Sequence, residues 1–286
     1  MNSNIITCKD KLFPDRLRQL AQIPKALYYK GENLDALLQG PTVAIVGSRK
    51  VSPYGRSVTT RLAHDLAQAG VTIVSGLALG VDSIAHTATL DADGKTIAVL
   101  PCGIDIVYPA QHYQLAKHII ASGGVLVSEY PGDLRPQKYQ FIARNRIIAG
   151  LSRGVLITEA ALGSGSLHTA EFALELGLEV FAVPGNITSQ NSAGTNKLIK
   201  NGATPVTSVE DILEALHISP SPVIKSTSNF SGDELSIITL LQTQPHDGQA
   251  LQAQTKLTTD SFQQTMTLLE INGHVRKSTD GVWHLR

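Results

Sequence analysis

The chain has 286 residues, a length suited to one large domain or to one large and one small domain. Hydrophobic residues make up 42% of the sequence, which is enough for a sizeable buried core. Lysine and arginine together number 24, and so do aspartate and glutamate, so the overall charge does not mark a nucleic-acid-binding protein. Any basic surface that binds nucleic acid must therefore be local.

Cysteine usage and hydropathy exclude several further classes of protein. Only Cys8 and Cys102 occur, far apart in sequence, so we predict neither a disulfide framework nor a cysteine metal cluster. No apolar run approaches the length of a membrane span, and the N-terminus lacks the apolar core of a signal peptide. We expect a cytoplasmic protein with no membrane partner, no metal and no cofactor.

Residues 1–41 carry only short patterns. Phe13–Leu20 indicates a short helix, and Pro24–Gly31 indicates a short extended piece. A segment of this size is too small to bury a core of its own, so we expect it to dock on the domain that follows.

Residues 42–216 alternate apolar strands with helical patterns. The predicted strands are Val43–Val46, Val71–Ser75, Thr96–Leu100, Gly124–Ser128, Gly154–Thr158 and Val180–Val183. The helices between and after them are predicted at Tyr54–Ala69, Val81–Leu90, Gln111–Ala121, Ile142–Leu151, Ser166–Leu176, Thr195–Asn201 and Val209–Leu216. Continuous apolar strands that alternate with helices predict a doubly wound α/β domain with a parallel sheet.

The C-terminal part of the chain differs in character. Residues 217–231 hold prolines and serines without periodicity, which is typical of a linker. In residues 232–286, helical patterns at Leu235–Leu241 and Phe262–Leu269 precede a hairpin with an Asp280-Gly281 turn. Helices followed by a terminal hairpin predict a small winged-helix module.

The first candidate site is the Gly47-Ser48-Arg49 turn, which follows a buried strand and precedes a helix. Ligands of parallel sheets collect beyond the carboxyl ends of the strands, and the N–H groups of a helix N-terminus favour a phosphate there. The turn is neither a G-x-G-x-x-G dinucleotide fingerprint nor a P-loop. The alternative is a solvated arginine on a tight turn.

The second candidate site lies in residues 133–153, which hold five cations and one anion, a local excess of four. The cations are Arg135, Lys138, Arg144, Arg146 and Arg153, against Asp133. Tyr139 and Phe141 interleave with them, and single-stranded nucleic acid needs both phosphate-binding charges and rings for base stacking. Asn145 adds a donor and an acceptor that suit a phosphate or a base edge. The alternative is a helix with a solvated basic face and a core phenylalanine.

Two smaller groups complete the candidates. Gly163-Ser164-Gly165-Ser166 opens a helix after the fifth strand, which predicts either a second phosphate-binding turn or an ordinary helix start. Ser75, Asp82 and His86 contain the residue types of a catalytic triad. A capping aspartate and a packed histidine explain that spacing equally well.

Seven stretches together resemble the DprA/Smf family (DNA processing protein A). They are VAIVGSR at 43–49, SGLALGVDSIAH at 75–86, LPCGIDIVYP at 100–109, GGVLVSEYP at 123–131, FIARNRIIAGLS at 141–152, TEAALGSGSLHTAEFA at 158–173 and VPG…GTNKLIKNGA at 183–203. They occur in the order typical of the family and together cover most of residues 24–216. Several matched motifs make the resemblance more specific than any single one.

The resemblance implies an extended Rossmann domain that binds single-stranded DNA and loads the RecA recombinase during natural transformation. Arg49 matches the arginine of the family's glycine-serine-arginine loop. The residues that match its basic, aromatic DNA groove are Lys138, Phe141, Arg144 and Arg146. Two departures stand out: residues 1–41 are too short for the helical N-terminal domain of many members, and Ile142-Ala143 follows Phe141 where many members have a proline.

From these features we expect a single-stranded-DNA-binding protein without catalysis that protects incoming DNA and passes it to RecA. The alternative is a nucleotide or nucleoside-phosphate hydrolase on a related scaffold, with Glu171 as its helix glutamate. A module that only senses a nucleotide is a third possibility.

Two further expectations concern the last helices. Val209, Ile212, Leu213 and Leu216 form an apolar stripe that we expect to support a homodimer, unless it packs on its own sheet. Residues 231–286 carry four cations and six acids, a net charge of −2. The candidate recognition helix Thr258–Glu270 has no cation, so we expect the C-terminal module not to be the main DNA-binding surface.

Overall fold

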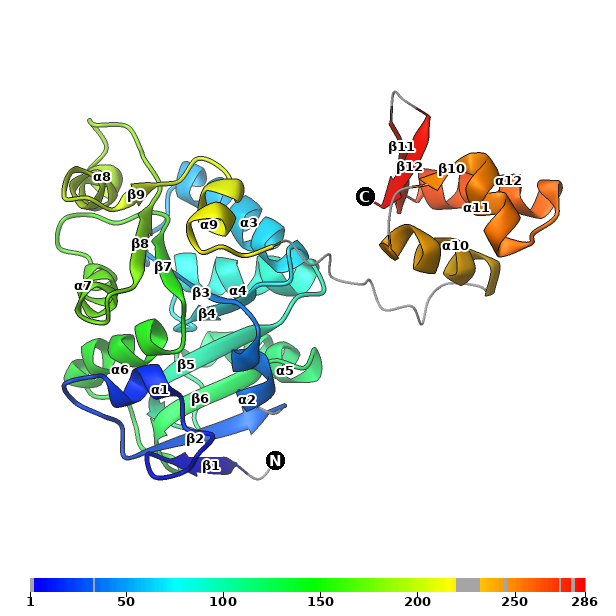
Figure 1. The fold of residues 1–286 in the computed structure, drawn as a ribbon. Coiled ribbons are helices and arrows are strands. Elements are labelled where there is room, and N and C mark those ends of the chain that lie inside the picture. Colours follow the sequence, from blue (N-terminus) through cyan, green and yellow to red (C-terminus); the bar gives the residue numbers. More distant parts are fainter. Residues whose placement is uncertain are drawn as a thin grey trace. The chain divides into compact units, whose positions relative to one another are not determined.

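A computed structural model describes residues 3–32, 34–219, 232–243, 246–272, 274–278 and 281–285. The chain divides into two compact units, Met1–Val223 and Ile224–Arg286, each of which is described by itself. Within the described residues, no helix is both long enough and apolar enough to cross a membrane. Figure 1 shows the helices and strands of both units.

The first unit is built on one nine-stranded sheet with the strand order β1-β2-β6-β5-β4-β3-β7-β8-β9. The strands are β1 (Asn4–Thr7), β2 (Ala26–Gly31), β3 (Thr42–Val46), β4 (Thr72–Ser75), β5 (Thr96–Gly103), β6 (Val125–Tyr130), β7 (Gly154–Ile157), β8 (Glu179–Ala182) and β9 (Thr204–Pro205). In this order across the sheet, every pair of neighbouring strands from β6 through β5, β4, β3, β7 and β8 to β9 is parallel, which confirms the predicted α/β class.

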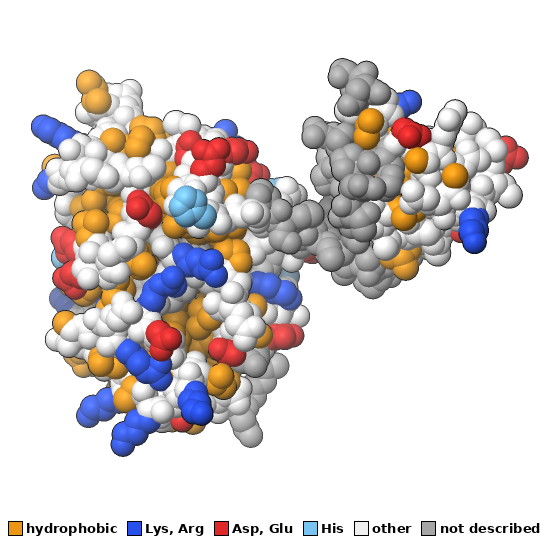
Figure 2. Space-filling view, in the orientation of Figure 1, with side chains coloured by type: hydrophobic (Ala, Val, Ile, Leu, Met, Phe, Trp, Pro, Cys, Tyr) orange, Lys and Arg blue, Asp and Glu red, His pale blue; other side chains and the backbone are white. Residues whose placement is uncertain are grey.

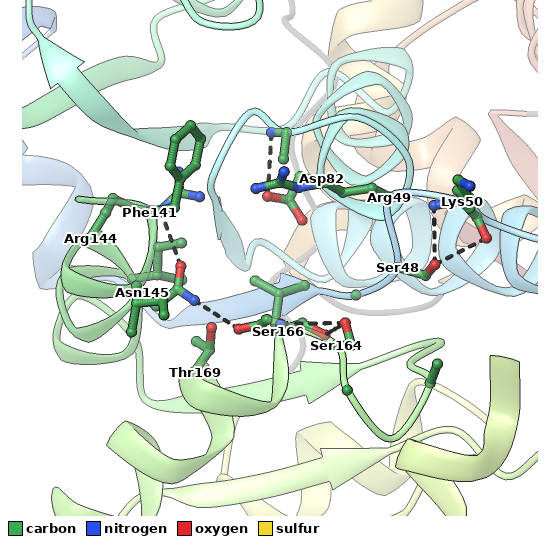
Figure 3. Close-up of a pocket in the computed structure, with 18 of the residues that line it drawn as sticks. Ser48, Arg49, Lys50, Asp82, Phe141, Arg144, Asn145, Ser164, Ser166 and Thr169 are labelled. Carbon is green, nitrogen blue, oxygen red and sulfur yellow. Dashed lines mark hydrogen bonds between the residues drawn. The ribbon is translucent and has the colours of Figure 1, made fainter. Parts of the chain in front are cut away.

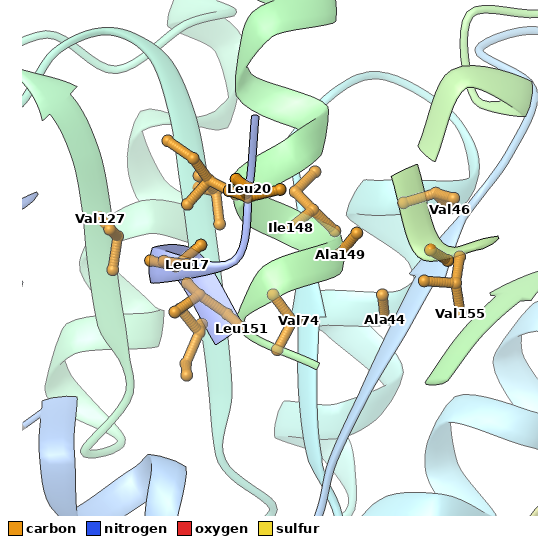
Figure 4. Close-up of a cluster of buried hydrophobic side chains, with 14 of the residues drawn as sticks. Leu17, Leu20, Ala44, Val46, Val74, Val127, Ile148, Ala149, Leu151 and Val155 are labelled. Carbon is orange, nitrogen blue, oxygen red and sulfur yellow. The ribbon is translucent and has the colours of Figure 1, made fainter. Parts of the chain in front are cut away.

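Helices cover both faces of this sheet. They are α1 (Asp15–Arg18), α2 (Leu34–Gln39), α3 (Pro53–Gln68), α4 (Val81–Asp91), α5 (Tyr113–Ala121), α6 (Lys138–Gly150), α7 (Leu167–Glu175), α8 (Ala193–Lys200) and α9 (Glu210–Ala215). The alternation of side chains along β3 separates two cores: Val43 and Ile45 pack with α3 and α4, whereas Ala44 and Val46 pack with α6 and α7. Figure 1 shows these helix pairs on opposite sides of the sheet, and Figure 4 shows the second core.

The N-terminal segment does more than dock on the sheet. β2 pairs antiparallel with β6, and β1 pairs antiparallel with β2, so the segment extends the sheet by two strands. Leu17 of α1 is buried against α6, where a side chain in place of Gly150 would meet it at 2.3 Å. The sequence predicted the docking and the extended piece at Pro24–Gly31, but not the strand pairing or α2.

Helix α6 starts four residues earlier than predicted, at Lys138 instead of Ile142. The Gln137 amide donates to Oε1 of Gln140 at 2.5 Å, so a glutamine side chain satisfies a backbone donor that the first turn leaves unpaired. This part of the expected loop over 129–140 is therefore helical. Phe141 consequently lies in the first turn of α6.

The apolar stripe on α9 packs inside the unit. Ile212 and Leu213 are buried in the core shared with α3, and Val209 and Leu216 pack against the same core. Ile212 and Leu213 are therefore corrected as dimer-contact residues because the unit's own core covers them, whereas for the partly buried Val209 and Leu216 such a contact stays a prediction. The homodimer itself stays a prediction.

The described residues of the second unit form three helices and a three-stranded antiparallel sheet. Its elements are α10 (Gly232–Thr243), β10 (His246–Asp247), α11 (Gly248–Thr255), α12 (Thr259–Ile271), β11 (Val275–Lys277) and β12 (Val282–Leu285). Ile237, Leu251 and Leu269 belong to its own core, which also includes Phe262. The winged-helix assignment stays a prediction. Residues 220–231 of the expected linker, and Asp280 of the expected turn, lie outside the described residues.

Candidate nucleic-acid interface

Three of the predicted segments meet around one cavity of about 650 Å³ beyond the carboxyl ends of the parallel strands. They are the turn after β3, the turn after β7 and the N-terminal half of α6 (Figure 3). The residues that line the cavity are Val46, Gly47, Ser48, Arg49, Lys50, Ala78, Asp82, Phe141, Ile142, Arg144, Asn145, Ile148, Ala161, Gly163, Ser164, Gly165, Ser166, Thr169 and Asn191. The position agrees with the rule that ligands of open α/β sheets bind at this edge.

The turn after β3 is held by the segment that follows β7. The Ser48 amide donates to the Glu159 carbonyl at 2.7 Å, and a Cβ at Gly47 would lie 2.7 Å from the same oxygen, so only glycine fits. The buried Glu159 carboxylate accepts from the Ser52 amide at 2.8 Å and from the Ser52 hydroxyl at 2.5 Å. Ser52 in turn caps α3. Glu159 therefore fixes both the turn and the start of the helix.

Arg49 and Phe141 are neighbours at the mouth of the cavity. Arg49 is exposed, and its guanidinium carbon lies 5.1 Å from the centre of the Phe141 ring. The Tyr108 ring meets the Phe141 ring edge-on, with centres 5.5 Å apart and an interplanar angle of 70°. Phe141 is only half-buried and belongs to none of the hydrophobic core clusters. The ring is therefore a surface feature placed beside a cation.

Arg144 lines the cavity but is buried and heavily hydrogen-bonded. One terminal nitrogen donates to the Gly76 carbonyl at 2.6 Å and to the Val99 carbonyl, and Nε donates to Oδ1 of Asn145 at 3.2 Å. Burial lowers the pKa of the guanidinium to about 10, although the nearby Asp82 opposes that shift. Arg144 therefore ties the chain just after β4 and the middle of β5 to α6, and contact with DNA remains a prediction for it.

Asp82 is the one acidic residue among those that line the cavity. Its carboxylate accepts from the amides of Gly76 at 3.1 Å and Ala78 at 3.4 Å. Burial raises its pKa, and the Arg144 charge acts in the opposite direction. With Arg49, Lys50 and Arg144 against Asp82, the lining carries three positive charges and one negative, a net +2.

Arg146 and Lys138 do not line the cavity. Arg146 is buried and pairs with Glu129, with 2.6 Å between Nη2 and Oε2, while Lys138 is exposed at the start of α6. Residues two apart on a helix point in different directions, so Arg146 cannot share the face of Arg144. Their roles in DNA binding stay predictions. On the face of the first unit that Figure 2 shows, one group of lysine and arginine side chains lies near the centre and others lie toward the edges.

The turn after β7 is positioned by α6. Nδ2 of Asn145 donates to the Gly165 carbonyl at 3.0 Å, and the Ser164 and Ser166 hydroxyls lie 2.7 Å apart. Both polar atoms of the Asn145 side chain thus form hydrogen bonds within the protein that help to shape the turn, and contact with DNA stays a prediction for it. Thr169 is buried and lines the cavity, although it was not among the predicted site residues.

The two enzymatic interpretations find no support in the side-chain positions. The Ser75 hydroxyl donates to the Ile45 carbonyl at 2.6 Å, and Nδ1 of His86 lies 2.7 Å from the Thr96 hydroxyl, so neither contacts Asp82. Glu171 is exposed, pairs with His168 at 2.8 Å and does not line the cavity. No cluster of three or more potential metal ligands occurs within the described residues.

A family model described as DNA recombination-mediator protein A matches residues 4–217. The chain belongs to this family. Protein Smf of Escherichia coli is 48% identical over 238 residues, which cover 82% of this chain and 63% of Smf. The DNA processing protein DprA of Bacillus subtilis is 42% identical over 213 residues, which cover 74% of this chain and 71% of that protein. The resemblance inferred from the sequence is thus confirmed.

Two solved structures of family members share the fold. The structure of DNA processing protein A from Streptococcus pneumoniae is 41% identical with a TM-score of 0.69, and the match covers 75% of this chain and 74% of that one. The protein from Helicobacter pylori is 36% identical with a TM-score of 0.66, and the match covers 75% of this chain and 96% of that one. The latter work describes a single-stranded DNA binding mode of that protein.

Proposed function

We propose that the chain binds single-stranded DNA at the cavity between the turns after β3 and β7. One observation carries the proposal: the two turns predicted to bind phosphate and a half-exposed phenylalanine line the same cavity, whose lining has a net charge of +2. Backbone amides and Arg49 would hold phosphates, and Phe141 would stack on a base. The single-stranded DNA binding mode described for the Helicobacter pylori relative supports this assignment.

Stacking on Phe141 accounts for a preference for single strands. Bases in a duplex already stack on their neighbours, so a protein ring gains a base only where the strand is unpaired. The Tyr108 and Phe141 rings meet edge-on, with centres 5.5 Å apart, and this contact restricts the orientations open to the Phe141 ring. A ring restricted in this way loses little rotational freedom when a base binds to it.

The wider role follows from the family. We propose that the protein protects incoming DNA during natural transformation and passes it to the RecA recombinase, as a homodimer with a C-terminal winged helix. The family description as a recombination mediator and the relatives named as DNA processing proteins support this role. Because the chain matches 63% of the length of Smf, the activity of that whole protein is likewise only proposed for it.

A titration separates this function from its rivals. Full-length protein is titrated against a labelled single-stranded oligonucleotide, the same oligonucleotide as a duplex, and nucleoside monophosphates. We expect binding to the single strand and no release of inorganic phosphate. Hydrolysis of a nucleoside phosphate would establish the hydrolase, and binding of monophosphates without binding of oligonucleotides would establish a nucleotide sensor.

A further inference from the structure

The cavity has a buried hydroxyl that the protein itself does not use. Thr169 is 1% exposed, and its Oγ1 has no hydrogen-bond partner within the described residues. Buried hydroxyls in folded proteins nearly always have a partner, so an unpaired one that lines a cavity is available to donate to a ligand. In Figure 3 the hydroxyl points from α7 toward the cavity, beside Ser166 and Asn145.

Other donors surround the same point. Thr169 is the third residue of α7, a nine-residue helix whose N-terminus carries partial positive charge. Within the described part of the chain, the amides of Gly163 and Gly165 form no hydrogen bond. The Ser164 and Ser166 hydroxyls bond to each other, which occupies one of their two hydrogens and leaves the other to donate.

The depth of the cavity and the charge of its lining both indicate which chemical group would bind at the cavity floor, which Ser166 and Thr169 form. Arg49 at the mouth is exposed, whereas Ser166 and Thr169 are buried, so a ligand must extend inward to reach them. A phosphodiester has a sugar on each side and only two terminal oxygens. A phosphomonoester has one free end, three terminal oxygens and a charge of about −1.5 to −2 at pH 7, which balances the +2 of the lining.

We infer that the floor formed by Ser166 and Thr169 binds a phosphomonoester, the terminal phosphate of a DNA strand. The inference rests on the proposed function, since it takes the cavity to be the entry point of a strand. The remainder of the strand leaves past Arg49 and Phe141 at the mouth. A free nucleoside monophosphate offers the same chemistry, and the experiment distinguishes the two sources.

The test compares three oligonucleotides of one sequence with an internal label: one with hydroxyl ends, one with a 5′-phosphate and one with a 3′-phosphate. Full-length protein should bind one phosphorylated form roughly tenfold more tightly than the hydroxyl form, the size of one charge-assisted hydrogen bond. Thr169→Val should bring the Kd of the phosphorylated form close to that of the hydroxyl form, whereas Thr169→Ser should retain the difference. The advantage should shrink below about pH 6, where the monoester gains a proton.

Thr89→Val is the matched control, because Thr89 is buried outside the cavity and donates to Ala85. If Thr169→Val does not fold, Gly165→Ala tests the same floor. This variant should fold, because an added Cβ at Gly165 meets no atom of the protein within 4 Å. Equal binding of all three oligonucleotides to the natural chain would overturn the inference and leave the proposed function intact. Direct binding of a nucleoside monophosphate that depends on Thr169, without any oligonucleotide binding, would keep the site and reject the DNA strand as its ligand.

Discussion

Replacing Phe141 with alanine is the sharpest test of the proposed interface. In the free protein the ring contacts Arg49 and Tyr108 and lies outside the hydrophobic core clusters. Its removal therefore deletes a surface ring and creates no core cavity. We expect the variant to fold and to lose affinity for single-stranded DNA.

The structure sets the size of both effects. An exposed cation–π contact contributes about 0.5–1 kcal/mol and an edge-on aromatic pair about 0.5–1.5 kcal/mol, so the free energy of unfolding should fall by no more than roughly 2.5 kcal/mol. A stacked base contributes about 1–3 kcal/mol, which corresponds to roughly a 5- to 150-fold weaker Kd. The salt dependence of binding should change little, because the substitution removes no charge.

The assay is fluorescence anisotropy with a labelled oligonucleotide at several salt concentrations, paired with urea unfolding. Tyr139→Ala is the matched control, since this ring is 67% exposed on the same helix and does not line the cavity. Its affinity should equal that of the natural chain. An unchanged Kd for folded Phe141→Ala, or a loss of stability well above 3 kcal/mol, would show that Phe141 is a structural residue and would refute the stacking argument.

Three further predictions use the same measurements. Arg49→Ala should weaken oligonucleotide binding and reduce the salt slope by about 0.7 for each phosphate that the arginine neutralises; an unchanged slope in a folded variant would remove Arg49 from the site. A chain that ends after Ser219, and so keeps the buried Ile218, should bind single-stranded DNA within a few-fold of the full chain; loss of most affinity in a folded fragment would move the binding surface to the second unit. Burial lowers the pKa of His86 to about 3 against about 6.5 when unfolded, so its contribution to stability is complete above pH 6.5 and decreases as the pH falls toward 3. Between pH 7 and pH 5 the free energy of unfolding of the first unit should therefore fall by about 2 kcal/mol more in the natural chain than in His86→Gln. Tyrosine fluorescence reports on the first unit because all seven tyrosines precede residue 140. Identical pH dependences in the two chains would contradict the lowered pKa of His86.

Local patterns predicted the central strands but not the edge of the sheet. Strands such as β3 and β7 are buried on both faces and therefore have a continuous apolar run that the sequence displays. β2 has the mixed sequence ALYYKG, and only its pairing with β6 makes it a strand of this sheet. That pairing joins residues about one hundred positions apart, and nothing local in residues 26–31 encodes it.

The site was predictable as a set of segments but not as individual contacts. Parallel strands bring the turns after β3 and β7 to one edge, so the two glycine-serine turns could be placed together from sequence. Arg144, Asn145 and Arg146 looked equivalent, and the fold separates their roles through partners distant in sequence: the Gly76 and Val99 carbonyls, the Gly165 carbonyl and the Glu129 carboxylate. Thr169 carried no signal that distinguished it from an ordinary helical threonine.

The contacts of α6 explain why the cavity keeps its shape without a ligand. Arg144 bonds to the chain after β4 and at β5, and the adjacent Asn145 bonds to the turn after β7, so one helix joins segments of the chain at or after three strands. A side chain at Gly76 would place Cβ 2.4 Å from the Arg144 guanidinium carbon, so this arrangement also requires glycine there. Because internal hydrogen bonds hold these turns, the amides and Phe141 would already be oriented for the proposed DNA strand, and its binding would require little further ordering of the protein.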